Sequence, residues 1–418
     1  LPGGIDSHCH MDQPLYGGAR TADDFLSGTT SAACGGTTTV MPFAYQEKGG
    51  SLREVVEAYR VKARDKAVID YAIHLVVSDP SPQVLGQELP ALIGDGYSSF
   101  KIYLTYDSLR LDDRQVLEVL ALARREGAMV MIHAENHEAI GWLTEGLELV
   151  GRTAPRNLAG SRPMAVEREA THRAMFLAEL AEVPVLIVHV SGAEAVEQIR
   201  WARARGQEVY AETCPQYLFL TEQDLGRPGF EGAKYMCCPP PRDAANQEVI
   251  WQGLAGGVFQ VFSSDHAPYR FEGDDGKKVH GTEAGFSRMP PGVPGLETRL
   301  PLLFSEGVGK GRISLQDFVA LTATNAARIY GLWPRKGTLA VGADADIALW
   351  DPAREVTISN DLLHHAVDYT PYEGMAVTGW PVMTLSRGAP VCRDGEFLGT
   401  PGQGRFLACD KPLPARPS

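Results

Sequence analysis

Six residues of this sequence have the chemistry of metal ligands, and each lies in or at the end of an apolar run that is typical of a buried β-strand. Imidazole and carboxylate groups are the side chains that zinc and related transition metals prefer, together with thiolates. The runs are far apart in the sequence, so only a fold that gathers strand ends at one place can bring these side chains together. The six residues are His8, His10, Lys101, His133, His189 and Asp265.

His8 and His10 form an H-x-H pair. Alternate residues of a strand point to the same face, so both imidazoles can reach one metal ion. A pair of structural histidines would give the same pattern. His133 and His189 each end a further apolar run, and they favour the metal interpretation over the structural one.

Lys101 lies inside the apolar run Phe100–Leu104, where an unpaired ammonium group is costly to bury. A salt bridge to a nearby carboxylate is one explanation. The other is that the neutral amine adds carbon dioxide and becomes a carbamate, an anionic ligand with two oxygens that can bridge two metal ions. Asp265 can bind metal and accept a proton from bound water. The adjacent His266 points to the opposite face, and we expect it to be structural.

The ligand-bearing runs belong to a larger alternation of strand-like and amphipathic helical segments. Strict alternation predicts a parallel sheet, and eight units predict closure into a TIM-like (β/α)8 barrel, an α/β fold whose chemistry gathers at the C-terminal strand ends. The predicted strands are Gly4–His10, Thr37–Pro42, Asp70–Val77, Ser99–Thr105, Ala128–Glu135, Pro184–Ser191, Glu208–Pro215 and Val258–Ala267, and the predicted helices are Leu52–Asp65, Asp113–Gly127, Glu167–Ala181, Ala193–Gly206 and Asn246–Gly257.

The pattern changes after residue 336, where short strand-like pieces alternate with Gly and Pro. We therefore expect a barrel over residues 1–336 and part of a small accessory β-sandwich domain over residues 337–399. Residues 400–418 are rich in Pro and Gly and predict an extended C-terminal tail. Because the chain begins with Leu1 rather than Met, we expect the missing strands of the small domain to lie upstream of it.

The composition of the chain argues against some classes of binding partner. The formal net charge of -13 argues against nucleic acids and anionic membranes, which need clustered Lys and Arg. No apolar run is long enough to span a membrane, and no signal peptide is recognisable. The 7 Cys residues show no disulfide-framework spacing, which is typical of reduced thiols in a cytoplasmic protein.

Several ordered motifs carry a resemblance that covers the whole predicted barrel. The sequence is similar to the dihydropyrimidinase and D-hydantoinase branch of the amidohydrolase superfamily. The motifs are Pro2-Gly-Gly-Ile-Asp-Ser-His-Cys-His10, Ser99-Phe-Lys101, His133-Ala-Glu-Asn, His189-Val-Ser, Glu212-Thr-Cys-Pro, Lys234-Tyr-Met-Cys-Cys-Pro-Pro-Pro-Arg242, Ser264-Asp-His266 and Gly292-Val-Pro-Gly-Leu-Glu297.

The resemblance implies a centre of two zinc ions, with manganese or cobalt as alternatives. His8, His10 and Asp265 would hold one ion, and His133 and His189 the other. Carboxylated Lys101 and a hydroxide would bridge them.

The resemblance also implies substrate contacts. Tyr106, five residues after Lys101, would polarise the scissile carbonyl. Main-chain groups of Cys238 and Thr298 would hold the ring, where many relatives carry Ser and Asn. Leu15, Tyr103 and the stretch near Arg110 would set substrate size and stereochemistry.

The implied activity is the hydrolytic ring opening of cyclic ureides, such as 5,6-dihydropyrimidines or 5-substituted hydantoins, to N-carbamoyl amino acids, by a homotetramer. Allantoinase, with a similar ligand set, is the alternative. Dihydroorotase is disfavoured because Met11 stands where it usually carries Arg. Non-catalytic assembly relatives have lost metal ligands, whereas all six positions are present here.

Overall fold

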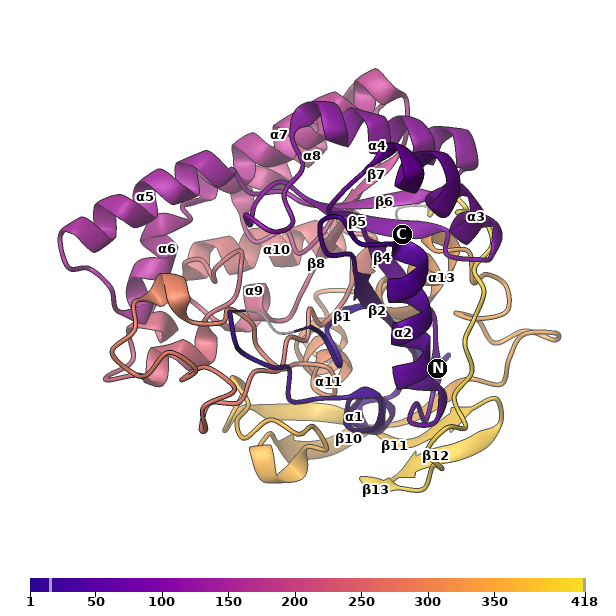
Figure 1. Cartoon of the computed structure of the whole chain (residues 1–418). Coiled ribbons are helices and arrows are strands. Elements are labelled where there is room, and N and C mark those ends of the chain that lie inside the picture. The colour runs from indigo at the N-terminus through magenta and orange to yellow at the C-terminus, as the bar shows by residue number, and fades with distance from the viewer. Residues whose placement is uncertain (15–16, 416–418) are drawn as a thin grey trace.

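The computed structural model describes residues 1–14 and 17–415, and its centre is a parallel sheet that curls into a barrel (Figure 1). A parallel bridge between Cys9 and His266 joins the last strand to the first, with the amide of His10 donating to the carbonyl of His266 at 2.7 Å. The strands pair in the order β1 (Gly4–Cys9), β2 (Thr37–Tyr45), β4 (His74–Val76), β5 (Ser99–Tyr103), β6 (Met129–His133), β7 (Val185–Ile187), β8 (Val209–Thr213) and β9 (Val261–Phe262).

The structure confirms the predicted (β/α)8 class and corrects one strand. The predicted strand Asp70–Val77 is interrupted: β3 (Asp70–Tyr71) and β4 both pair with β2. The main chain of β3 also pairs with a distant segment. The amide of Tyr71 donates to the carbonyl of Arg405 at 3.0 Å, and the carbonyl of Tyr71 accepts from the amide of Leu407 at 2.8 Å.

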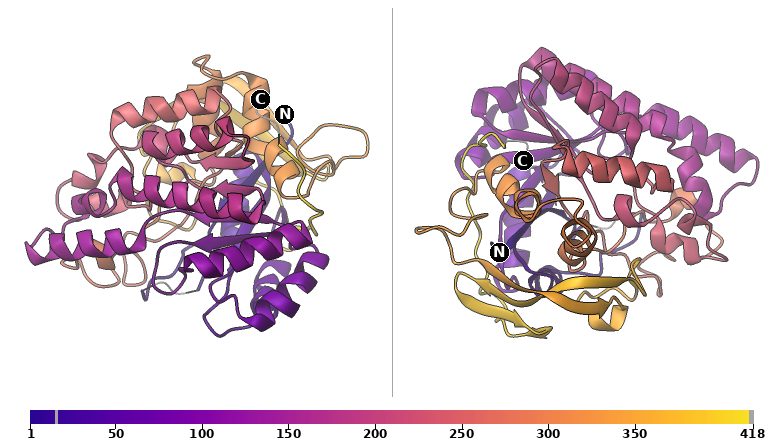
Figure 2. Two further views of the ribbon diagram at one scale, coloured as in Figure 1. Left: turned by 90° about the horizontal axis from the view of Figure 1, so that it is seen from above. Right: turned by 180° about the vertical axis from the view of Figure 1, so that it is seen from behind.

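Helices cover the outside of the barrel (Figure 2). Their starts follow capping chemistry: Asp112 caps α4 and accepts from the amide of Gln115, and Gly127 ends that helix in the left-handed conformation at φ 75°. The helices are α1 (Phe25–Cys34), α2 (Leu52–Arg64), α3 (Leu89–Gly94), α4 (Asp113–Glu126), α5 (His137–Leu149), α6 (Leu158–Ser161), α7 (Met164–Ala181), α8 (Ala193–Ala204), α9 (Gln216–Phe219), α10 (Ala244–Ala255), α11 (Arg299–Leu303), α12 (Leu315–Val319) and α13 (Asn325–Ile329).

Strand alternation decides which side chains reach the barrel interior. On β6, Val130 and Ile132 join the cluster beneath the helices, whereas Met129 and Met131 join the cluster inside the barrel. His133, two residues beyond Met131, continues the inner face at the C-terminal end of the strand. The apolar interior therefore leads directly into the candidate site.

Beside the barrel lies an antiparallel sheet made of β10 (Ile347–Thr357), β11 (Ala376–Ser386), β12 (Ala389–Arg393) and β13 (Glu396–Phe397). Phe304 stacks on Trp350 of β10 with ring centroids 4.6 Å apart. The first residues of the chain also join this sheet, since Pro2 bridges Ile347 and the Leu1 amine donates to the Ala348 carbonyl at 2.9 Å.

The segment after residue 400 runs extended along the barrel, where Phe406 bridges Tyr71 of β3. Its amides donate to carbonyls of Ala67, Gly96 and Gly331 at 2.8 to 2.9 Å. Leu407 and Cys409 are buried. Of the helices in the described part of the chain, none combines the length and apolar character that crossing a membrane requires.

Candidate active site

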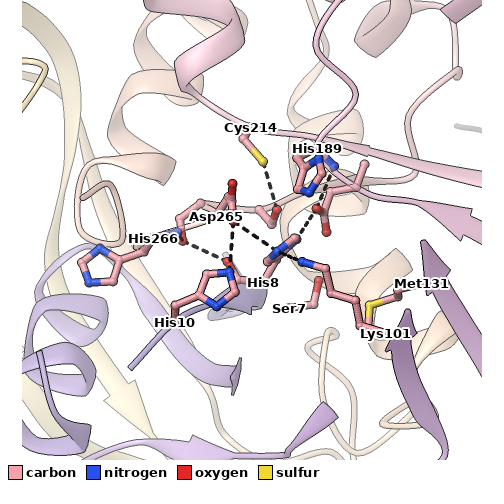
Figure 3. A network of polar contacts seen from close by, with 12 residues as sticks. Ser7, His8, His10, Lys101, Met131, His189, Cys214, Asp265 and His266 are labelled. Carbon is pink, nitrogen blue, oxygen red and sulfur yellow. Dashed lines mark hydrogen bonds and ion pairs between the residues drawn. The ribbon is translucent and has the colours of Figure 1, made fainter. Parts of the chain in front are cut away.

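Five of the six predicted metal ligands are linked at the C-terminal ends of the strands (Figure 3). The Nε2 atoms of His8 and His10 lie 3.2 and 3.3 Å from the same Oδ1 of Asp265. The Nζ of Lys101 lies 2.8 Å from Nε2 of His8, and the His8 and His189 ring centroids are 5.4 Å apart. One ligand atom each from His8, His10 and Asp265 fits within 4.8 Å of the others, as a shared metal ion requires.

His133 completes the set from the neighbouring strand. Its ring lies 4.5 Å from that of His189, centroid to centroid. Both residues are buried, and within the described residues Nδ1 of His189 has no hydrogen-bond partner. A buried nitrogen left without a partner is costly, so this atom is placed as a ligand atom would be.

Burial and the neighbouring charges favour the neutral imidazole that metal binding needs. Desolvation, reinforced by Lys101, lowers the pKa of His8 to about 3, and desolvation lowers that of His10 to about 4. Burial alone would raise the pKa of Asp265, but the charges of His8, His10 and Lys101 and the hydrogen bond to His10 outweigh it and hold that pKa at about 2. Asp265 is therefore ionised at neutral pH.

Lys101 has no simple salt bridge. Among the residues that the structure describes, no carboxylate oxygen lies within 4.0 Å of its Nζ, which instead faces His8 and the rings of Phe43 and Tyr103 at 4.6 and 4.9 Å. Desolvation lowers the pKa of Lys101 to about 8, opposed by Asp265 and Glu212. The salt-bridge explanation of its burial is not supported by this geometry.

Two buried carboxylates that sequence reasoning missed hold the imidazoles from behind. Glu212 of β8 accepts from Nδ1 of His8 at 2.6 Å, and Glu135 lies 2.8 Å from Nε2 of His133 and pairs with Arg162 at 2.5 Å. Such partners fix the orientation of a ligating histidine. A signal was present, because Glu135 lies two residues after His133 and Glu212 lies in the predicted strand Glu208–Pro215.

The site also concentrates strained backbone. Tyr106, His189 and Asp265 have φ values of 70°, 38° and 47°, in the left-handed region that side chains other than glycine rarely adopt. Such conformations persist only where the surroundings impose them, and they gather at functional sites. By contrast, His266 has the structural place predicted for it: its ring is directed away from His8 and lies 3.1 Å from Asp23 (Figure 3).

A pocket of about 100 Å³ opens directly onto the ligand cluster. Three of the residues predicted to contact the substrate line it: Tyr103, Tyr106 and Cys238. The Tyr106 hydroxyl forms a hydrogen bond with the Cys238 thiol. The ring centroids of Tyr106 and His133 lie 5.3 Å apart. The other described lining residues include Leu109, Cys237, Tyr269, Pro291 and Gly292.

Thr298 is the predicted contact that the structure places elsewhere. It precedes α11, and its hydroxyl donates to the Gly295 carbonyl at 3.3 Å. In the described chain Pro291 and Gly292 line the pocket instead, and Thr298 lies in the turn just before α11. Leu15 lies outside the described residues.

The described residues fit a centre of two transition-metal ions. The donor set is four imidazoles, a carboxylate and an amine, and neighbouring imidazoles lie 4.5 to 5.4 Å apart, centroid to centroid. Nitrogen-rich donor sets of this kind suit zinc and its neighbours. Arg110 takes no part, since it is exposed and pairs with Glu138 at 2.8 Å.

Comparison with known proteins identifies the relatives. The model of the amidohydrolase family matches residues 1–391. A D-hydantoinase of Geobacillus stearothermophilus is 47% identical over 409 residues, which cover 97% of this chain and 86% of that protein. The crystal structure of a dihydropyrimidinase from Brevibacillus agri NCHU1002 is 45% identical, with a TM-score of 0.96 over 99% of this chain and 89% of that one. An L-hydantoinase (dihydropyrimidinase) from Arthrobacter aurescens is 29% identical, with a TM-score of 0.87 over 97% and 88%. The chain therefore belongs to the amidohydrolase family, in the branch of the hydantoinases and dihydropyrimidinases.

Proposed function

We propose that this protein hydrolyses the ring amide bond of cyclic ureides, 5-substituted hydantoins or 5,6-dihydropyrimidines, and releases N-carbamoyl amino acids. The observation that carries the proposal is the small pocket that opens onto five linked donor groups, in a chain 47% identical to a D-hydantoinase. Allantoinase is the weaker alternative, because the relatives named above are hydantoinases or dihydropyrimidinases.

We propose that His8, His10 and Asp265 hold one zinc ion and that His133 and His189 hold the second. Lys101 would bridge them after its neutral amine adds carbon dioxide and loses a proton, which turns a buried cation into an anionic ligand with two oxygens. When bound, the metal pair would supply a water of lowered pKa and a positive charge beside the carbonyl oxygen.

The chain's own residues then have separate tasks. Asp265, ionised and 9% exposed, can accept the proton of the attacking water and return it to the leaving ring nitrogen. The Tyr106 hydroxyl can donate a hydrogen bond to the carbonyl oxygen on which negative charge develops. The wall that includes Cys238 and Gly292 would hold the ring in place beside the donor groups.

The relatives also favour one hand of the substrate. This chain is 47% identical to the Geobacillus D-hydantoinase and 29% identical to the Arthrobacter L-hydantoinase. We therefore propose a preference for D-configured 5-substituted hydantoins. Self-association as a homotetramer is a further proposal, supported by the exposed Trp142 and Leu149 of α5 and Val150 just after it.

The test is a comparison of ring-opening rates on dihydrouracil, D- and L-5-substituted hydantoins and allantoin, with protein supplied with zinc and bicarbonate. We expect turnover of hydantoins or dihydrouracil and a chiral carbamoyl product of the D series. Protein treated with a chelator serves as the control and should be inactive. Faster turnover of allantoin than of the other ureides would contradict the proposal.

A further inference from the structure

A second fully buried lysine lies beside the pocket, outside the metal-ligand cluster. Lys277 belongs to the long segment after β9 and is 1% exposed. Its Nζ donates to the carbonyls of Gly292 at 2.7 Å, Pro290 at 2.8 Å and Met236 at 3.4 Å. Among the described residues, no carboxylate pairs with it within 4.0 Å. A buried ammonium group without a counter-ion is expensive, so its retention here needs an explanation.

The three carbonyls belong to the two segments that form the pocket wall. Met236 directly precedes Cys237 and Cys238, and Pro290 directly precedes Pro291 and Gly292. Those four following residues line the pocket. The two segments also bond each other, since the amide of Gly292 donates to the carbonyl of Met236 at 2.7 Å. Lys277 therefore ties together two parts of the wall that come from distant places in the sequence.

Peptide geometry extends this effect beyond the carbonyls. A trans peptide unit is planar and holds its N–H opposite its C=O. By fixing the carbonyls of Met236 and Gly292, Lys277 also fixes the direction of the amides of Cys237 and Val293. A displacement of about 1 Å in such groups is enough to weaken the binding of a small rigid ring.

We propose that Lys277 is a positioning residue for the substrate ring: its ammonium group sets the spacing and orientation of the main-chain wall formed by residues 236–238 and 290–292. This inference rests on the proposed function for its substrate, a cyclic ureide. It assigns no proton transfer and no metal contact to Lys277. Burial lowers the pKa of Lys277 to about 7.

The segment that carries Lys277 has other anchors, so it need not unfold when the ammonium group is lost. Asp368 accepts from the amides of Phe271 and Glu272, each at 2.7 Å. The amide of Arg20 donates to the carbonyl of Asp275 at 2.7 Å. The task of Lys277 is thus separable from holding the segment in place.

The adjacent Lys278 provides a matched control on the same segment. Its Nζ pairs with Glu272 at 2.6 Å and lies 4.5 Å from the centre of the Phe271 ring, with the side chain 23% exposed. It contacts no wall carbonyl among the described hydrogen bonds. Lys278→Met therefore removes a lysine without touching the pocket wall.

The experiment compares Lys277→Met, Lys277→Gln and Lys278→Met with the unmodified holoenzyme. For Lys277→Met we expect KM for the preferred ureide to rise about ten-fold with kcat changed less than about three-fold, the signature of lost binding that is equal in ground and transition states. Lys277→Gln keeps two N–H donors, so its KM should lie between those of the unmodified enzyme and Lys277→Met. Metal content should be unchanged, and hydrogen exchange should accelerate in peptides 236–238 and 290–293.

An unchanged KM and unchanged exchange in folded Lys277→Met would overturn the proposal, as would equal effects in Lys278→Met. If the methionine variant does not fold, Lys277→Gln decides by the same readouts. Unmodified protein that opens no ureide would contradict the proposed function, whereas the exchange comparison would still test whether Lys277 orders the wall.

Discussion

Replacing Lys336 with methionine is expected to destabilise the junction between the barrel and the small sheet. The Lys336 side chain is 1% exposed, and its Nζ lies 2.6 Å from Asp346, 2.7 Å from Asp70 and 2.9 Å from Asp344. Asp70 belongs to β3 of the barrel, and Asp346 immediately precedes β10. One cation therefore joins carboxylates from both parts of the fold.

The expected magnitude depends on the partners that each carboxylate keeps. Asp70 still pairs with Arg387, and the side chain of Asp344 is 27% exposed and can be hydrated. Asp346 is buried, and among the described contacts its carboxylate keeps only the amide of Arg387 at 2.8 Å. One uncompensated buried carboxylate remains, so Lys336→Met should cost about 3–5 kcal/mol in the free energy of unfolding.

Urea denaturation followed by tryptophan fluorescence measures this loss. Lys310→Met, at an exposed lysine, is the control and should change the free energy of unfolding by less than about 0.5 kcal/mol. The double variant Lys336→Met with Asp346→Asn removes the orphaned charge as well, and should cost less than the sum of the two single changes by about 1 kcal/mol or more. Strict additivity, or a single-variant loss below about 1 kcal/mol, would refute the reasoning.

Three further predictions concern the site and its surroundings. The hydrogen bond to Glu297 and the charge of Glu297 raise the pKa of His364 from 6.5 to about 9, so this stabilisation is complete below pH 6.5 and is lost as pH rises through 9. The free energy of unfolding, measured by thermal unfolding, should fall by about 1–2 kcal/mol between pH 7 and 10 after solvent screening. An equally steep fall in His364→Gln would refute the assignment. Tyr106→Phe should lower kcat about 10²–10³-fold with little change in KM, and unchanged steady-state kinetics would remove the hydroxyl from the reaction. Lys101→Ala should bind neither metal ion and show no turnover; elemental analysis that finds two bound ions would exclude a bridging role for Lys101.

The sequence was informative where local periodicity decides geometry. Side-chain alternation within β1, and within the neighbouring strands β5 and β6 that carry Lys101 and His133, already determines which face of the barrel these residues occupy. The eight strand positions were predicted for the same reason, since buried parallel strands are short continuous apolar runs. Features that depend only on the hydrophobic period and on turn residues could therefore be predicted.

Contacts between distant segments could not be predicted in this way. The hydrogen bond between Glu212 and His8 joins residues 204 positions apart, and the place of Glu212 near a strand end does not identify His8 as its partner. Thr298 was expected to hold the ring because of a motif, but it lies just before α11 and outside the lining of this pocket, which includes Pro291 and Gly292. The break in the third strand likewise depends on a segment more than 300 residues away.

The pairing of the segment after residue 400 with β3 has a consequence for biosynthesis. Tyr71 acquires its main-chain partners Arg405 and Leu407 only when those residues have left the ribosome, and Leu1 waits in the same way for Ala348. Contacts between residues so far apart in the sequence form late, and they make folding slow. During most of its synthesis the nascent barrel therefore lacks these main-chain partners of β3, and its apolar strands are exposed to solvent. A chaperone can bind this exposed apolar surface during that period.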